Sequence, residues 1–252
     1  MPDLPTNQRL LLALQFWDGD SERAGQLADF LCAQEPSPQW RADLLFFARS
    51  DAAKPAWTDH PHPNFQTYFA RSARVGTGWP DGPNQLWFGL IEYLRSACRD
   101  GRMPRYSGIF TLEPDCIPIR QDWVHLLFQE WHKRGVDFLG AAMNGPDLAV
   151  APHTNGNMIV RGSDEVLSAV AEQAAECPKD QAWDVWLYPF LARNFRVSGS
   201  DLIFNCWQSP TIAAAAVYHW RRQGIALIHG VRDDSCLRHA REQLPPLTPR
   251  ET

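Results

Sequence analysis

The sequence predicts an open α/β fold in which a mostly parallel, Rossmann-type sheet carries helices on both faces. Apolar runs of strand length, such as 9–17 and 42–51, are separated by a segment whose apolar residues recur at helical spacing. Two buried strands joined by a helix are typical of a parallel βαβ unit. The 252 residues are enough for one sizeable core, so we expect a single domain over 1–252 with a disordered tail at 243–252.

The first third of the chain supplies the repeating unit. The run over 9–17 predicts a strand, and after a glycine turn the apolar spacing predicts a helix that begins near Ser21. Residues 42–51 predict a second buried strand. Residues 52–81 are rich in Pro, His, Trp and Gly without a sustained period, so we expect a long loop with one short element at 65–70.

The rest of the chain continues the alternation of strands and helices. Gly135 follows a helical stretch and is typical of a helix C-terminus, whereas Pro189 predicts a kink or a break. The expected strands are 106–116, 136–143, 157–162, 198–207 and 224–230, and the expected helices are 81–98, 120–135, 163–176 and 181–194.

Composition excludes several classes of protein. The formal net charge of −5 argues against a general nucleic-acid surface. No apolar stretch is long enough to span a membrane, and no signal peptide is recognisable, so we expect a cytoplasmic protein without a membrane span. The six cysteines lie far apart without a C-x-x-C pair, which favours reduced thiols over a zinc site or a disulfide framework.

Polar residues follow three of the predicted strands where each strand ends. In an open α/β sheet, ligands bind at the carboxyl ends of the strands. We therefore expect residues 16–20, Ser50 with Asp51, and residues 113–116 to lie along one edge of the sheet.

The third of these groups contains an acidic pair. In the stretch "GIFTLEPDCIPIRQDW", Glu113 and Asp115 are two residues apart, a spacing that points both carboxylates to one side of an extended backbone. Two such acids repel each other unless a cation or a proton lies between them. Carboxylate oxygens suit Mg²⁺ or Mn²⁺, which share their coordination with substrate phosphates. The alternative is an ordinary acidic turn at the surface.

A buried strand that ends in acid-x-acid and continues as "IPIRQDW" resembles the D-x-D motif of GT-A nucleotide-sugar glycosyltransferases. This resemblance implies a GT-A-like sheet, a bound Mn²⁺ or Mg²⁺ and a nucleoside-diphosphate sugar as donor. The pair is E-P-D here, so Asp115 is expected to bind the metal directly and Glu113 to act on the donor side through water. In "LIHGVRDDS", His229 resembles the carboxyl-terminal histidine that completes the metal shell, and Arg232 resembles a nearby basic residue for the diphosphate.

Further motifs follow in the order that this family would place them. "GWPDGPNQLW" opens a helix at Asn84, where free N–H groups would hold a phosphate or a sugar hydroxyl; the alternative is a capping residue. "HTNGNMIV" resembles the acceptor-side strand, with Asn155 and Gly156 next to the sugar, or else forms a plain turn. "AWDVWLY" resembles the helix that supplies the base of inverting members, with Asp184 as base and Trp183 at the acceptor; the alternative is a helix cap.

The first strand ends in "QFWDGD" and not in a familiar base-binding signature, so the donor nucleotide stays open. Phe16 or Trp17 is expected to stack on the base, and Asp18 or Asp51 to bond its edge or the ribose. Positive charge for the leaving diphosphate is expected from Arg232, with Arg71 or Arg74 of the long loop as a second source.

The expected function is therefore a metal-dependent transfer of a sugar from a nucleoside-diphosphate sugar to an acceptor hydroxyl, with inversion if Asp184 is the base. Two alternatives remain. A sugar nucleotidyltransferase would carry a Gly-rich loop after the first strand, and "WDGDSERAG" has no G-x-G. A non-catalytic nucleotide- or carbohydrate-binding protein would use some of the eleven tryptophans as a stacking platform. The acceptor, whether a glycan, a metabolite, a protein or a modified DNA base, is left open.

Overall fold

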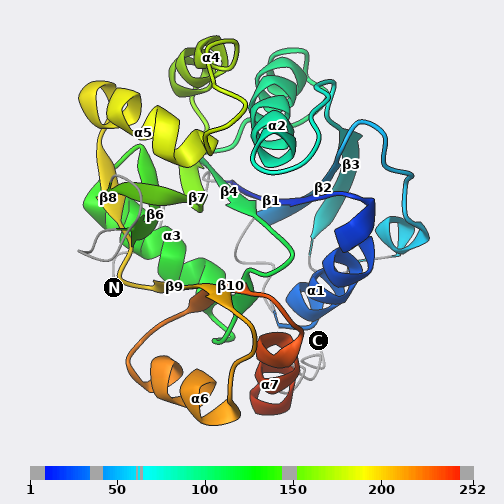
Figure 1. The fold of residues 1–252 in the computed structure, drawn as a ribbon, viewed down its shortest axis with the longest axis vertical. Helices are drawn as coiled ribbons and strands as arrows, with labels where there is room; N and C mark the ends of the chain where they lie inside the picture. The colour runs from blue at the N-terminus through cyan, green and yellow to red at the C-terminus, as the bar shows by residue number, and fades with distance from the viewer. Residues whose placement is uncertain (1–8, 35–41, 61, 63–64, 144–151, 245–252) are drawn as a thin grey trace.

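A seven-stranded sheet runs through the centre of the molecule (Figure 1). The structure is a computed structural model that describes residues 9–34, 42–60, 62, 65–143 and 152–244. The strand order is β3-β2-β1-β4-β7-β6-β8, and β7 alone runs antiparallel to its neighbours. The strands are β1 Leu10–Phe16, β2 Ala42–Ala48, β3 Gln66–Arg71, β4 Gly108–Leu112, β6 Phe138–Met143, β7 His153–Arg161 and β8 Val197–Gly199.

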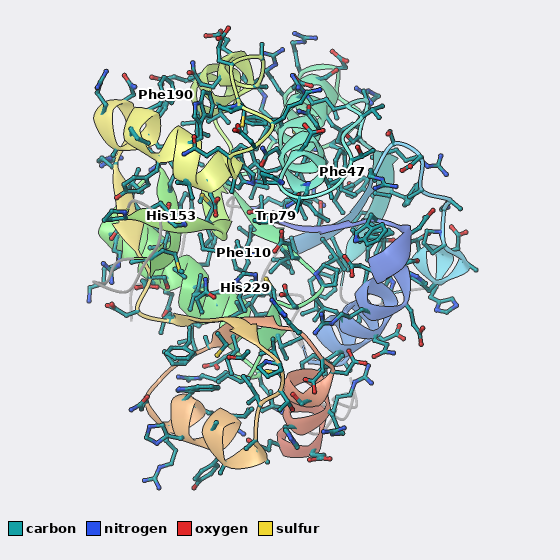
Figure 2. All side chains as sticks on the ribbon, viewed as in Figure 1. Phe47, Trp79, Phe110, His153, Phe190 and His229 are labelled. Carbon is teal, nitrogen blue, oxygen red and sulfur yellow. The ribbon has the colours of Figure 1, made fainter. Side chains whose placement is uncertain are left out.

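Helices cover both faces of this sheet. One face carries α2 (Asp81–Arg99), α4 (Asp164–Gln173) and α5 (Trp183–Asn194), and the other carries α1 (Ser21–Gln34) and α3 (Trp123–Arg134) (Figure 1). Alternate residues of each strand enter the two resulting cores, with Phe47 on the α2 side and Phe110 on the α3 side (Figure 2). The predicted fold class is thereby confirmed. No helix in the described ranges is long and apolar enough to cross a membrane.

A second sheet of three strands, in the order β5-β10-β9, extends the core on the α1 and α3 side. It consists of β5 (Ile117–Pro118), β10 (Leu227–Val231) and β9 (Ile203–Ser209), and α6 (Ala214–Arg222) and α7 (Ser235–Gln243) pack beyond it. β5 follows β4 after four residues and pairs antiparallel with β10. This pairing brings the carboxyl-terminal part of the chain against the acidic turn that follows β4.

The sequence-based elements differ from the structure at several boundaries. The short element expected at 65–70 within the long loop is present as the edge strand β3, which is shifted by one residue and pairs in parallel with β2. The strand expected over 106–116 ends at Leu112, and the acids that follow lie in a turn. Pro189 lies within an uninterrupted α5. The short helices α6 and α7 were not predicted, because each carries few buried apolar residues. The expected tail begins at Gln243, the last residue of α7; Leu244 is buried, and 245–252 lie outside the described residues.

A buried acid joins the amino-terminal ends of the sheet strands. Asp43 is 2% exposed, pairs with Arg9 at 3.0 Å and accepts a hydrogen bond from the Tyr106 hydroxyl at 2.7 Å. Burial and the neighbouring carboxylate raise the pKa of Tyr106, so its hydroxyl stays a donor. We expect Asp43→Ala to lower the free energy of unfolding by about 3 kcal/mol, because it leaves both partners without their acceptor.

Urea denaturation of the two proteins measures this difference. The control is Asp59→Ala, which removes an exposed carboxylate paired with Lys54 and is expected to cost less than about 1 kcal/mol. Equal effects of the two substitutions would contradict the structural role of Asp43.

Candidate active site

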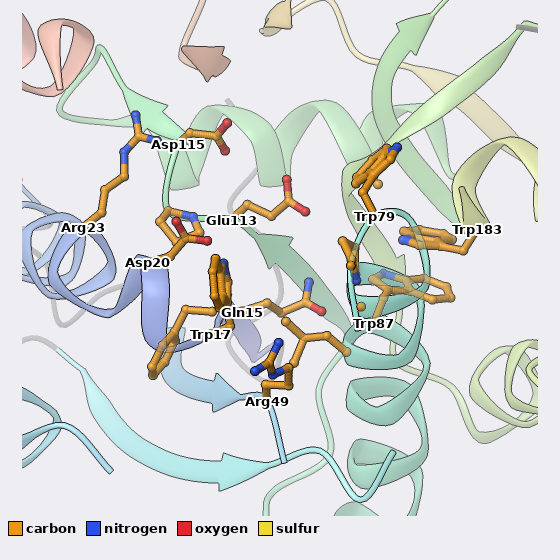
Figure 3. A pocket seen from close by; sticks show the side chains of 17 residues that line it. Gln15, Trp17, Asp20, Arg23, Arg49, Trp79, Trp87, Glu113, Asp115 and Trp183 are labelled. Atoms are coloured by element: carbon orange, nitrogen blue, oxygen red, sulfur yellow. The ribbon is translucent and has the colours of Figure 1, made fainter. Parts of the chain in front are cut away.

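The carboxyl ends of β1, β2 and β4 open into a cleft of about 460 Å³ (Figure 3). Strand register explains why these ends meet: Phe16 pairs with Ala48 of β2, and Leu14 pairs with Leu112 of β4. The residues that follow each strand therefore share one edge, as predicted. The cleft is lined by Gln15, Phe16, Trp17, Asp20, Arg23, Arg49, Gly78, Trp79, Gly82, Pro83, Leu86, Trp87, Glu113, Pro114, Asp115, Gly156 and Trp183.

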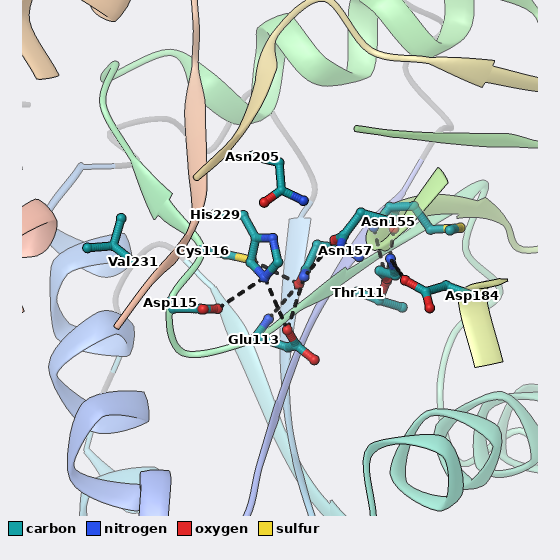
Figure 4. A network of polar contacts seen from close by, with 12 residues as sticks. Thr111, Glu113, Asp115, Cys116, Asn155, Asn157, Asp184, Asn205, His229 and Val231 are labelled. Atoms are coloured by element: carbon teal, nitrogen blue, oxygen red, sulfur yellow. Dashed lines mark hydrogen bonds and ion pairs between the residues drawn. The ribbon is translucent and has the colours of Figure 1, made fainter. Parts of the chain in front are cut away.

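Two acids that line this cleft contact a buried histidine that does not line it (Figure 4). The Nε2 atom of His229 lies 3.3 Å from Oε2 of Glu113 and 3.4 Å from Oδ1 of Asp115. The acids come from the turn after β4, and the histidine comes from the middle of β10 in the small sheet. The acidic pair and a histidine more than a hundred positions further along the sequence thus meet because β5 pairs with β10.

The charges of these three residues depend on one another. Burial disfavours ionisation of Glu113, but His229 and the Asn157 amide outweigh it, so the pKa of Glu113 is lowered. Burial raises the pKa of Asp115, and the charge of His229 opposes that shift only in part. The pKa of His229 is raised because both carboxylates outweigh the effect of its burial. Without a metal ion, the imidazolium is therefore the cation that neutralises the acidic pair.

The same residues fit a divalent metal ion. Oδ1 of Asp115 is buried and accepts no hydrogen bond from any residue within the described ranges, which leaves a lone pair for a ligand. Carboxylate oxygens with one imidazole nitrogen suit Mn²⁺ or Mg²⁺. The Cys116 sulfur lies within 4.8 Å of ligand atoms of Asp115 and His229, but its thiol donates to Oδ1 of Asn157, and burial raises its pKa well above the usual range. Cys116 is thus protonated in this arrangement.

Asn157 in β7 fixes the position of the acids. Its Oδ1 accepts from the backbone N–H of Glu113 at 2.9 Å, and its Nδ2 donates to the Glu113 carboxylate at 3.1 Å. Asn155 in turn accepts from both the backbone and the side chain of Asn157. Asn155, which was expected at the acceptor, therefore acts on the site through Asn157 and does not line the cleft.

The α1 side of the cleft carries two guanidinium groups and an exposed indole. Arg23 donates to the backbone oxygens of Val231 and Asp233 at 2.6 and 2.7 Å, which fixes its head group beside the acids. The Arg49 guanidinium lies 5.4 Å from the ring centre of Trp17, which is 46% exposed. Burial raises the pKa of Asp20, the remaining acid on this side of the cleft.

The α2 side of the cleft is built from tryptophans. Trp87 and Trp183 stack with ring centres 3.4 Å apart, and Trp79 projects from the loop before α2 with 69% of its surface exposed (Figure 3). Gly156 is required for the position of Trp183, because a Cβ atom at this residue would lie 2.7 Å from the indole. Gly156 therefore allows a close approach, although to a ring of the protein and not to a bound sugar.

Asp184 is the second residue of α5 and directly follows Trp183 in the chain (Figure 4). Its Oδ2 accepts from the N–H of Gly156 at 3.1 Å, and its Oδ1 accepts from the N–H of Val185 at 3.0 Å. Burial raises the pKa of Asp184, and His153, whose Nε2 lies 3.9 Å from Oδ2, opposes this shift. Asp184 itself does not line the cleft, but its neighbours Trp183 and Gly156 do.

Several expected site residues have other contacts. The Asn84 amide is 1% exposed, accepts from the N–H of Trp183 and donates to the Gln181 carbonyl, so it joins α2 to the start of α5. The N–H groups of Gly82 and Asn84 bond to backbone oxygens, which removes the free donors expected at this helix start. Arg74 is held by two hydrogen bonds to Glu92.

Some of the other residues expected to bind the nucleotide of the donor line the cleft, and others lie outside it. Phe16 lines the cleft but is 1% exposed and packs against Trp57, so it is a core residue, and Trp17 has the accessible ring. Asp51 is exposed and binds Arg49 through two hydrogen bonds. The remaining expected residues that lie outside the cleft are Asp18, Arg71 and Arg232.

Sequence reasoning missed several residues of the cleft. Arg23 is part of the quoted stretch "WDGDSERAG", and its place soon after the first strand was a usable signal; Asp20 was expected at this edge but was given no role. Arg49 follows β2 in the same way, because its N–H bonds to the carbonyl of Phe16. Gln15 and Trp79 had no such signal, since one lies within a buried strand and the other in a loop without periodicity.

No protein-family model matches the sequence, and no curated protein matches it. Solved structures of glycosyltransferases do match the fold. Against the WbbM bifunctional glycosyltransferase the TM-score is 0.58 at 11% identity, over 97% of this chain and 51% of that one. Against the galactosyltransferase LgtC, in complex with donor and acceptor sugar analogs, the TM-score is 0.54 at 10% identity, over 94% and 97%.

A third match has nearly the same length as this chain. It is a glycosyltransferase involved in glycosylation of the major capsid protein of PBCV-1, with a TM-score of 0.51 at 12% identity over 93% of this chain and 98% of that one. The chain thus spans about half of WbbM and almost the whole of the other two structures. At these identities the likeness establishes the fold, which is the GT-A-like glycosyltransferase fold that the sequence predicts.

Proposed function

We propose that the protein is a metal-dependent glycosyltransferase that moves a sugar from a nucleoside-diphosphate sugar to an acceptor hydroxyl. The observation that carries this proposal lies at one strand end, where a buried carboxylate oxygen of Asp115 accepts no hydrogen bond from the described residues and lies 3.4 Å from the imidazole of His229. The cleft beside it holds two guanidinium groups, from Arg23 and Arg49. Carboxylates for a cation, guanidiniums for phosphate and an indole for a base together match the parts of a nucleoside diphosphate.

In this proposal Asp115 and His229 would hold Mn²⁺ or Mg²⁺, and Glu113, positioned by Asn157, would act on it through water. When bound, the metal neutralises charge on the departing diphosphate as a Lewis acid. Arg23 adds a fixed positive charge on the same side, since its two backbone contacts hold it in place before the substrate binds. Trp17 offers its exposed face to the base, and the carboxylate of Asp20, which lines the cleft, accepts a hydrogen bond from a ribose hydroxyl.

The transfer itself breaks the bond between the sugar carbon C1 and the diphosphate oxygen and forms a bond from C1 to the acceptor oxygen. The acceptor proton passes to Asp184 in this proposal, and attack from the face opposite the diphosphate inverts the configuration. Burial raises the pKa of Asp184 towards the range of a useful base. For this role the acceptor hydroxyl enters beside Gly156, which lines the cleft and donates to Asp184. The solved LgtC complex, which holds donor and acceptor sugar analogs, supports two substrates in this fold.

Nucleotide binding tests the proposal without knowledge of the acceptor. Titration calorimetry with UDP, GDP, ADP, CDP and TDP, each with Mn²⁺ and with a chelator, should find one diphosphate that binds tightly only with the metal. Binding of that diphosphate to the same extent in chelator would contradict the metal site. If the folded protein bound none of the five, the proposal would fail, and a non-catalytic carbohydrate-binding protein would become the better interpretation.

A further inference from the structure

The cleft has two halves of different chemistry. Its charged side chains come from the segment after β1, from α1, from the residue after β2 and from the turn after β4; they are Asp20, Arg23, Arg49, Glu113 and Asp115. The half that faces α2 is lined by neutral residues, namely Gln15, Gly78, Trp79, Gly82, Pro83, Leu86, Trp87, Gly156 and Trp183. A ligand that fills the whole cleft therefore has one charged part and one uncharged part.

Gln15 is the polar side chain of this neutral half. It is 6% exposed, and its amide forms no hydrogen bond with any residue in the described part of the chain. Its neighbours Leu11 and Ala13 in β1 pack into the α2-side core, so by strand alternation Gln15 faces α2 as well. Figure 3 shows its side chain extending between Trp17 and Trp87. The amide is thus open to the cleft, where one ligand can bond both its oxygen and its nitrogen.

The surroundings of Gln15 restrict what that ligand is. A hydroxyl group both donates and accepts a hydrogen bond, so it matches a carboxamide that does the same. The indole rings of Trp87 and Trp183 offer apolar contact but no countercharge for a carboxylate or an ammonium group. Glu113 at the border of this half repels a further negative charge. Arg49 belongs to the charged half of the cleft, where two hydrogen bonds to Asp51 orient its guanidinium group.

We propose that the α2-side half of the cleft binds the transferred sugar, that this sugar is an uncharged pyranose, and that Gln15 selects it by bonding one of its ring hydroxyls. This inference rests on the proposed glycosyl transfer and goes beyond it, since it names the class of sugar and the residue that recognises it. Sugars with a carboxylate, such as uronates, are disfavoured because Glu113 repels their charge and the residues of the neutral half supply no countercharge.

The test separates the sugar from the nucleotide. Calorimetry measures the Kd of the diphosphate selected in the panel above and the Kd of its hexose and uronate, for example UDP, UDP-glucose and UDP-glucuronate, or GDP, GDP-mannose and GDP-mannuronate. In the wild type we expect the hexose to bind at least about tenfold more tightly than the uronate. Gln15→Met, which nearly conserves volume, should leave the Kd of the diphosphate within about twofold and weaken hexose binding about tenfold.

Two further variants complete the experiment. Gln66→Met alters an exposed glutamine in β3 and should change neither Kd. Gln15→Asn keeps the amide but shortens the side chain. If Gln15→Met does not fold, this variant still tests whether the Gln15 amide contacts the sugar. Equal weakening of diphosphate and hexose in the Gln15 variants would assign Gln15 to the nucleotide and overturn the inference, as would wild-type binding of the uronate as tightly as the hexose. Absence of any diphosphate binding would instead overturn the proposed function.

Discussion

Asp115→Asn is expected to reduce sugar transfer, measured as release of the nucleoside diphosphate from a labelled donor, on the order of 10³-fold. Asparagine has nearly the same shape as aspartate, and its oxygen still lies near His229, so the fold should be retained. The substitution removes the negative charge of Asp115. Oδ1 of this residue is buried and accepts no hydrogen bond from the described residues. The variant should also lose the difference between diphosphate binding with Mn²⁺ and with chelator.

The matched control for this prediction is Asp18→Asn. Asp18 belongs to the same acidic edge of the sheet but is exposed and does not line the cleft. Its substitution should leave the turnover and the metal dependence of diphosphate binding within about twofold of the wild-type values. The reason is that solvent screens the charge of an exposed carboxylate outside the cleft. If Asp115→Asn behaved like Asp18→Asn, the acidic pair would have no catalytic role, and the histidine beside it would be its structural counterion.

The acidic pair shows what a sequence reveals about such a site. Glu113 and Asp115 follow a run of apolar residues, and that pattern alone predicted a strand that ends in acids at the ligand-binding edge. The pairing of His229 with them came from the family resemblance. The structure supplies its physical reason, which is the antiparallel pairing of β5 with β10. Local patterns thus located the edge, whereas the partner depended on a contact between distant segments.

The cations show where sequence reasoning failed. Arg232 and Arg74 were expected near the diphosphate because they follow a strand end or lie in a long loop, and neither lines the cleft. Arg74 is held by Glu92 through two hydrogen bonds, a contact 18 residues along the chain that no local pattern predicts. Arg23 occupies the site instead, since the first turn of α1 follows β1 directly. Its backbone contacts at Val231 and Asp233 depend on tertiary structure alone.

Asn84 and Gly156 illustrate a third kind of outcome. Each was selected because its residue type suits a ligand, and each has a partner within the protein instead: Asn84 bonds the start of α5, and Gly156 makes room for Trp183. Both contacts place the same helix, α5. A residue type that suits a substrate also suits a close contact between secondary-structure elements, and only the three-dimensional structure distinguishes the two.

Asp184→Asn is expected to lower transfer to an acceptor by about 10²–10⁴-fold if its carboxylate removes the acceptor proton. The substitution separates this role from a structural one. Asparagine keeps one oxygen, which can accept from the N–H of Gly156, and it loses only the contact with the N–H of Val185; the contact between Gly156 and Trp183 should therefore survive. It has no basic carboxylate, however. The Kd of the donor should therefore change less than about twofold while kcat falls.

Asp184→Ala provides the comparison, because it removes both the proposed base and the oxygen that accepts the hydrogen bond from Gly156. If Asp184 acts as the base, both variants should lose kcat to a similar extent, and only Asp184→Ala should weaken donor binding, through displacement of Gly156 and Trp183. If Asp184 is only an anchor, Asp184→Asn should keep nearly full activity and Asp184→Ala should lose it. In that case the proton acceptor would have to be sought elsewhere in the cleft, and the inversion inferred from Asp184 would lose its basis.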